Sequence, residues 1–169
     1  STMGQLEGLT QTVSAQQVAH DLAEKGFSFR QVLTFWRTYG TTEPCREYPW
    51  GKRASGSWLG QISKTSTTNE VVREIAIPES AAGKCCYMES KFMQELGGAT
   101  HTTRLVSHWW GNSFYNVLRC ICEEATGLSG VSLDVLISYR ELDVLDTEPF
   151  FGKLLPKGCL QRTYWMCIF

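Results

Sequence analysis

The sequence predicts an α/β fold in three layers around a partial parallel sheet, and three observations carry this prediction. A short β-like run at residues 105–109 is followed by a break at Gly111, and a helical pattern then covers residues 113–125. Strand, glycine turn and helix in this order form the first half of a βαβ unit. The third observation is the continuous apolar run at 164–169, which is typical of a parallel strand covered on both faces.

The central helix is predicted from one apolar stripe and from signals at its two ends. The stripe has the i, i+3, i+4, i+7 spacing of a helix face that packs on a core: Phe114, Val117, Leu118 and Ile121. Asn112 or Ser113 can cap the first turn, and Gly127 fits the C-terminal position where φ is positive. We therefore expect 105–109 and 164–169 to be neighbouring parallel strands, with 113–125 as their right-handed crossover helix.

The N-terminal part predicts an irregular arm at 1–13, a helical hairpin and a connecting loop at 40–66. Capping patterns begin at Ser14 and Ser28, each with glutamine three residues later. Two apolar stripes follow, one of Val18, Ala19, Leu22 and Ala23, the other of Phe29, Val32, Leu33 and Trp36. The stripes are open to two interpretations, binding of a partner or packing on the domain, and we expect packing.

Between the hairpin and the central unit, a capping box at Thr67–Glu70 predicts a short helix that ends at Pro78. Residues 84–88 are apolar enough for a buried strand, and 91–96 fit a helical turn that ends at the glycine pair 97–98. Residues 128–147 stay ambiguous, because their apolar positions fit both a strand and a helix. Acidic residues within 141–148 are interpreted as a solvated face.

Composition bounds the functional classes. A chain of 169 residues with 43% hydrophobic and 20% charged residues is one globular domain, with room for a small helical appendage. The formal charge of −1 argues against nucleic acid as the main partner, and no apolar run approaches the length of a membrane helix. Seven cysteines, an odd number without metal-ligand spacing, predict reduced thiols in an intracellular, reducing compartment and no metal site.

The candidate ligand-binding site is the segment between the predicted strand and the central helix. Its residues are Ser107, His108, Trp109, Trp110, Gly111, Asn112 and Ser113. His108 fits either a crevice or a hydrogen-bonded core position, and Trp109 fits either stacking on a ring or packing. A helix N-terminus beside a strand end attracts anions, so a small anionic ligand such as phosphate or a nucleotide is the expected class. Adjacent Ser107 and His108 face opposite sides of a strand, so no catalytic pair is assigned.

Several short motifs in this order carry a resemblance to a known family. They are residues 67–72 (Thr-Thr-Asn-Glu-Val-Val), 77–78 (Ile-Pro), 86–89 (Cys-Tyr-Met-Glu), 99–101 (Ala-Thr-His), 106–111 (Val-Ser-His-Trp-Trp-Gly) and 164–169 (Tyr-Trp-Met-Cys-Ile-Phe). Together they resemble a largely uncharacterised family of protist and algal proteins with a Ser-His-x-Trp-Gly segment, which looks related to Toll/interleukin-receptor (TIR) domains. The resemblance covers residues 65–169, and its most specific part is the Ser-His-Trp-Trp-Gly segment.

The resemblance implies a TIR-like, flavodoxin-like domain at 65–169 behind an N-terminal part at 1–64. Members of the family continue past the position of Phe169, so this chain is expected to be shorter than they are. The implied function is a protein-interaction or scaffold module that binds protein partners or copies of itself, as a subunit of a larger assembly and without a cofactor. The alternative is a nucleotide-binding or NAD-consuming enzyme that uses the crevice at 107–113. The glutamate that cleaves NAD in enzymatic TIR domains has no match in this chain.

Overall fold

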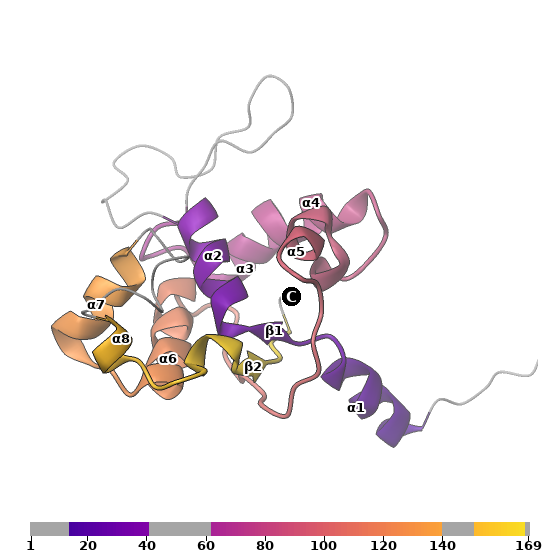
Figure 1. The fold of residues 1–169 in the computed structure, drawn as a ribbon. Coiled ribbons are helices and arrows are strands. Elements are labelled where there is room, and N and C mark those ends of the chain that lie inside the picture. The colour runs from indigo at the N-terminus through magenta and orange to yellow at the C-terminus, as the bar shows by residue number, and fades with distance from the viewer. Residues whose placement is uncertain (1–13, 41–61, 140–150, 168–169) are drawn as a thin grey trace, which may run out of the picture.

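The computed structural model describes residues 14–40, 62–139 and 151–167, which are mostly helical (Figure 1). The elements are α1 (Ala15–Ala23), β1 (Phe27–Ser28), α2 (Phe29–Tyr39), α3 (Thr68–Val71), the π-helix η1 (Val72–Ala76), α4 (Ile77–Ala81), the 3-10 helix η2 (Tyr87–Glu89), α5 (Lys91–Glu95), α6 (Phe114–Thr126), α7 (Gly130–Ser138), α8 (Phe151–Leu154), the 3-10 helix η4 (Cys159–Gln161) and β2 (Thr163–Tyr164). The predicted arm, most of the 40–66 loop and the acidic patch lie outside the described residues.

The predicted three-layer, flavodoxin-like parallel sheet is wrong. The described residues form a two-stranded sheet in which β1 and β2 run antiparallel, with Phe27 opposite Tyr164. The two segments predicted as parallel strands do lie side by side in parallel, but they meet through an isolated bridge between Leu105 and Trp165. One bridge does not make a ladder, and the described residues form no crossover βαβ unit.

The apolar C-terminal run misled the prediction because its burial alternates. Tyr164 and Met166 are buried, Trp165 is half-buried and Cys167 is exposed. This alternation is the pattern of a strand with one face on the core. Tyrosine, tryptophan and cysteine count as apolar in a sequence pattern, yet tyrosine and tryptophan carry a polar atom that water can reach. A run of such residues therefore does not require cover on both faces.

α2 and α6 supply much of the core, to which η1, η2, α5 and α7 also contribute. Phe35 on α2 packs edge-on against Phe114 on α6, with ring centroids 5.5 Å apart. Trp36 stacks on Phe114 at 6.5 Å and meets Tyr115 at 5.2 Å. Contacts of this kind add to the burial of large aromatic surfaces. The predicted stripes of α2 and of α6 are both confirmed as core faces.

Predicted helix ends are confirmed where the signal is local. Ser28 accepts a hydrogen bond from the Gln31 backbone N–H while the Gln31 side chain accepts from the Ser28 N–H, which is a complete capping box. Ser113 caps α6, and Gly127 ends it at φ 71°. The buried Gln31 side chain also donates to the carbonyl oxygen of Gly98 at 2.7 Å, so the cap ties α2 to the glycine turn.

The helix that begins after Thr67 does not end at Pro78, contrary to the prediction. α3, η1 and α4 follow one another without a break, and Pro78 lies in the first turn of α4. Proline has no N–H, and its ring clashes with the carbonyl four residues earlier in a regular helix. In η1 the Ile77 N–H instead bonds to the Val72 carbonyl, five residues back. The wider π turn moves the backbone ahead of Pro78, so the helix continues past it.

Two further segments correct or settle the predictions. The strand expected at 84–88 is wrong, because the chain there bends into η2. The ambiguous region at 128–147 begins with α7, whose C-terminal carbonyls at Leu136 and Tyr139 accept hydrogen bonds from Arg37 of α2. Burial lowers the pKa of the Arg37 guanidinium to about 10.

The first helix of the predicted hairpin does not join the core. α1 contains no buried residue, and in Figure 1 it lies at the periphery. It is fastened at its C-terminal end, where the Thr102 N–H donates to the Ala23 carbonyl at 2.9 Å and His101 pairs with Glu24 at 2.7 Å. Lys25 pairs with Glu89. The expectation that both stripes pack on the domain is therefore wrong for α1.

The core takes side chains from both sides of residue 64, although the division of the chain at that residue stays a prediction. Across the ranges that the structure describes, no helix has both the length and the apolar character needed to cross a membrane.

Candidate functional site

The segment predicted as the binding site begins in extended backbone beside the C-terminal segment. The Val106 N–H donates to the Trp165 carbonyl at 2.8 Å, and the Trp165 N–H donates to the Arg104 carbonyl at 2.8 Å. These two bonds flank Leu105, which leaves the Leu105 side chain 68% exposed. Residues 104–107, which we call the extended stretch, thus lie beside Trp165, although the two segments are far apart in the sequence.

After His108 the segment bends, and residues 109–113, which we call the corner, lie beside the first residues of α3 and of α6. The Asn112 carbonyl accepts hydrogen bonds from the Thr68 N–H at 2.9 Å and from its hydroxyl at 3.0 Å. The Trp110 carbonyl accepts from the Asn69 N–H at 2.9 Å. At α6 the Phe114 N–H donates to the Ser66 carbonyl at 2.9 Å. These N–H groups at the helix starts are engaged within the chain, so an anion at this corner would compete with them. The anionic ligand stays a prediction.

The tryptophans of this segment point outward. Trp109 is 73% exposed, and Trp110 is exposed while its Nε1 donates to the Cys167 Sγ at 3.2 Å. A Cβ built on Gly111 would lie 2.5 Å from the Trp109 ring. A side chain at position 111 would therefore require the exposed Trp109 ring to move, because the indole lies against this part of the backbone.

His108 is half-buried, and both of its ring nitrogens lie out of solvent without a hydrogen-bond partner among the described residues. It therefore forms no hydrogen-bonded pair with Ser107, which is exposed. Leaving a buried polar atom unpaired costs about 1–3 kcal/mol.

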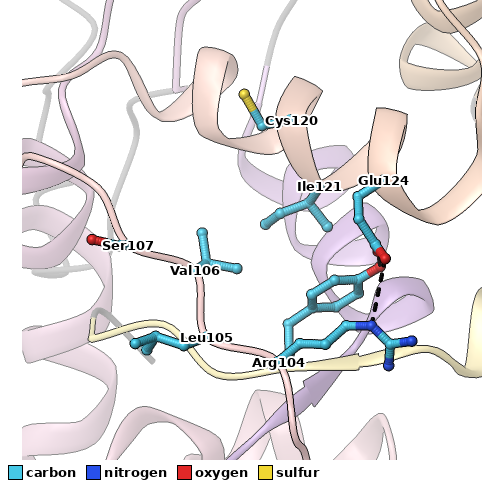
Figure 2. Close-up of a pocket in the computed structure, with 8 residues that line it drawn as sticks. Arg104, Leu105, Val106, Ser107, Cys120, Ile121 and Glu124 are labelled. Atoms are coloured by element: carbon cyan, nitrogen blue, oxygen red, sulfur yellow. Dashed lines mark hydrogen bonds and ion pairs between the residues drawn. The ribbon is translucent and has the colours of Figure 1, made fainter.

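A cavity of about 400 Å³ opens between the extended stretch and α6 (Figure 2). Its lining residues come from three segments: Arg104, Leu105, Val106, Ser107, Cys120, Ile121, Glu124 and Tyr164. Ser107 is the one predicted site residue that lines it. The other predicted residues, from His108 to Ser113, lie in or beside the corner instead.

At one end of this cavity Glu124 contacts three charged or polar side chains. Its Oε1 lies 3.5 Å from the Arg104 Nε and 3.4 Å from the Arg162 guanidinium, and its Oε2 accepts from the Tyr164 hydroxyl. Burial, followed by this hydrogen bond, raises the pKa of Tyr164. Figure 2 shows the dashed contact of Glu124 ending on the Arg104 Nε, with the two terminal nitrogens beyond it. The guanidinium also lies over the Tyr164 ring, 6.0 Å from the ring centroid, and among the described residues Glu124 is its one carboxylate partner.

A second hollow, of about 300 Å³, lies between α1 and the extended stretch, and we call it the apolar groove. Its lining is Ala19, Leu22, Ala23, Thr102, Thr103, Arg104, Leu105 and Trp165. Arg104 is the one charged residue in this lining and also borders the cavity beside α6. Within the described ranges, no group of three or more His, Cys, Asp or Glu side chains is placed to hold a metal ion.

Sequence reasoning missed the residues that line these two hollows, apart from Ser107. One signal for the cavity was present, since Cys120 and Glu124 are four residues apart on a helix and share a face. The apolar groove offered no such signal, because its walls come from residues near 20, 104 and 165. Comparison with protein-family models, with curated proteins and with solved structures finds no match for this chain.

Proposed function

We propose that this chain is a protein-interaction module that binds another protein through the apolar groove and through the exposed tryptophans of the corner. Nine large apolar side chains of the described residues are exposed. Five of them belong to α1 and to the extended stretch with its corner: Val18, Leu22, Leu105, Trp109 and Trp110. This concentration on two segments, with Leu22 and Leu105 lining the same groove, is the observation that carries the proposal, because grouped exposed apolar side chains mark interaction sites.

Energetics favour the same surface. Burying a leucine side chain contributes about 1.5–3 kcal/mol, and tryptophans at interface centres contribute about 2 kcal/mol or more. Leu105 and Trp109 are each more than two-thirds exposed, so a partner that covers them removes most of their surface from water. The corner behind Trp109 is held by backbone hydrogen bonds to α3, so little order has to be gained on binding.

Photo-crosslinking tests this proposal. A photoreactive amino acid replaces Leu105, and a matched variant carries it at Val131, a 79% exposed apolar position on α7. We expect covalent protein adducts from position 105 and none from position 131 when each chain is irradiated in a lysate of cells that naturally make it, whether the adduct is with a second copy or with another protein. Absence of protein adducts at 105, or equal adducts at both positions, would reject the proposal.

A small ligand in the cavity beside α6 is the second candidate, and it keeps the alternative of nucleotide or NAD binding open. Its volume of about 400 Å³ lies in the range of ligand pockets, and Arg104 at its edge offers a positive charge for a phosphate. Calorimetric titration with NAD and with ATP tests it. The Gly111→Val change should displace Trp109, and with His108→Ala it should weaken binding at least tenfold, about 1.4 kcal/mol, if the ligand reaches the corner. No binding at millimolar nucleotide rejects this candidate.

A further inference from the structure

We infer that the protein bound at the apolar groove is a second copy of this chain, with α1 of each copy lying in the groove of the other. The inference rests on the proposed function and adds the identity of the partner. In this arrangement Asp21 of each copy faces Arg104 of the other. The charges, the exposure of α1 and the lining of the groove each support it.

α1 is short and buries none of its nine residues. Leu22 in its apolar stripe is 42% exposed. Isolated helices shorter than about 12–15 residues are marginal in water, and most helices owe their stability to packing of their apolar face. Its hydrogen bonds and ion pairs to the rest of the chain are at its C-terminal end, at Ala23, Glu24 and Lys25. Packing against α1 of a second copy would supply the missing contact.

The lining of the apolar groove favours an occupant that carries one negative charge. Arg104 is the one charged residue of its lining, and its Nε lies 3.5 Å from the Glu124 Oε1. Its guanidinium lies over the Tyr164 ring, 6.0 Å from the ring centroid, and no second carboxylate among the described residues pairs with it, while the Arg104 side chain is 44% exposed. A helix that enters this groove should therefore carry apolar side chains and one carboxylate near them.

α1 has that composition. Histidine aside, the one charged residue within Ala15–Ala23 is Asp21. It stands three residues after Val18 and directly before Leu22, so it borders the apolar stripe. Its Oδ1 accepts a hydrogen bond from Gln17 at 2.7 Å, and no ion pair within the described residues joins it to Arg104 of the same copy. The helix and groove of this chain are thus complementary in apolar surface and in charge.

Two-fold symmetry doubles each contact. In an isologous dimer, a contact from residue i of one copy to residue j of the other occurs twice. Both stripes, both grooves and two Asp21–Arg104 pairs are then buried together. A different protein would need an apolar helix with a carboxylate at the same place, whereas a second copy of this chain already carries such a helix in α1.

Sedimentation velocity over a wide range of protein concentration tests the inference. We expect a reversible dimer for the parent chain. Leu22→Gln, Asp21→Arg and Arg104→Asp should each raise the dimer dissociation constant at least about tenfold. The double variant with Asp21→Arg and Arg104→Asp should recover most of the loss, because it restores opposite charges. Val131→Gln, at a 79% exposed apolar position on α7, is the control for Leu22→Gln and should dimerise like the parent.

Thermal melting of each variant separates association from folding. Arg104 also contacts Glu124, so Arg104→Asp is interpreted only if it melts like the parent; otherwise Leu22→Gln and Asp21→Arg on the exposed helix decide. A parent chain that stays monomeric at every concentration overturns the inference, and so does a folded double variant as weak as the singles. If the parent is monomeric but position 105 crosslinks to another protein, the proposed function stands and the second copy is excluded. If nothing crosslinks, both fall.

Discussion

α1 and α2 begin with the same signal and end in different environments. Each has a serine cap with glutamine three residues later, and each carries one apolar stripe. α2 buries its stripe in the centre of the core, whereas α1 buries nothing. The difference lies in the size of the side chains. The α2 stripe contains phenylalanine and tryptophan, while two of the four stripe positions of α1 are alanine.

The energetic consequence follows from area. A fully buried aromatic or aliphatic side chain contributes about 1.5–3 kcal/mol, but alanine offers about one methyl group. The stripe of α1 thus offers less apolar area to the core than the stripe of α2. An amphipathic pattern therefore predicts that a helix forms, and the volume of its stripe decides whether it joins the core or stays available to a partner.

The largest expected effect contrasts single truncations in the two helices. Trp36→Ala in α2 should lower the free energy of unfolding by about 3–5 kcal/mol, because it removes a buried ring that contacts Phe114 and Tyr115. Leu22→Ala in α1 should change it by less than about 0.5 kcal/mol. Urea unfolding of both variants, at a concentration where the parent is monomeric, measures the two values. Equal losses would mean that α1 belongs to the core after all.

Truncation of the α6 stripe extends the comparison to the second core helix. Leu118 is fully buried and Ile121 is 3% exposed, so Leu118→Ala and Ile121→Ala should each cost about 2–5 kcal/mol. Ile121 also borders the cavity, where neighbouring groups can relax, so its loss should be the smaller one. Thermal and urea unfolding give the order. Variants that melt like the parent would show that this stripe does not pack the core.

The two serine caps should differ as their helices do. Ser28→Ala removes half of a capping box on a buried helix and should cost about 1 kcal/mol of global stability. Ser14→Ala removes a similar bond from a helix outside the core, so global unfolding should not register it. Amide hydrogen exchange separates the two, since Ser14→Ala should still speed exchange within α1. A global loss from Ser14→Ala that matches the loss from Ser28→Ala would break the comparison.

The smallest effect concerns the ion pair at the end of α1. The hydrogen bond from Lys25 lowers the pKa of the Glu89 carboxyl. A carboxyl with a lowered pKa stabilises the fold above its unfolded value of about 4.3, and this contribution is lost as the pH falls through the lower folded value. Both side chains are more than a third exposed, so the effect stays under about 1 kcal/mol.

An NMR titration of the Glu89 carboxyl detects this ion pair without a stability measurement. Lys25→Met should raise the Glu89 pKa toward its ordinary value, and Lys91→Met, which removes the charge of an exposed lysine paired to Glu95, should leave it unchanged. An identical titration curve in Lys25→Met would show that the pair does not form in solution.

The sequence predicted features whose cause lies within a few residues. The capping boxes at Ser28 and Thr67, the α6 stripe and the glycine end at Gly127 are of this kind, because each needs only its own turn of helix. The fold class failed because it depended on pairing between 105–109 and 164–169. Extended backbone there satisfies its hydrogen bonds through one bridge, a corner and an antiparallel partner in β1.

The site shows the same limit. Sequence proximity grouped Ser107 to Ser113 as one site, whereas the structure places Ser107 at a cavity and His108 to Ser113 in or beside a corner. Leu105 and Leu22 meet at the apolar groove although they are far apart in the chain. No local sequence pattern predicts that these two leucines line one groove, because their proximity depends on the hydrogen bonds of Thr102 and Trp165 that position the extended stretch.

Hydrogen–deuterium exchange of α1 and α2 at several protein concentrations tests the central claim most directly. If a second copy covers α1 at the apolar groove, the amides of α1 become more protected as the concentration rises, while those of α2, already in the core, stay unchanged. Leu22→Gln should abolish the rise. Protection of the α1 amides that does not change with protein concentration would contradict the account.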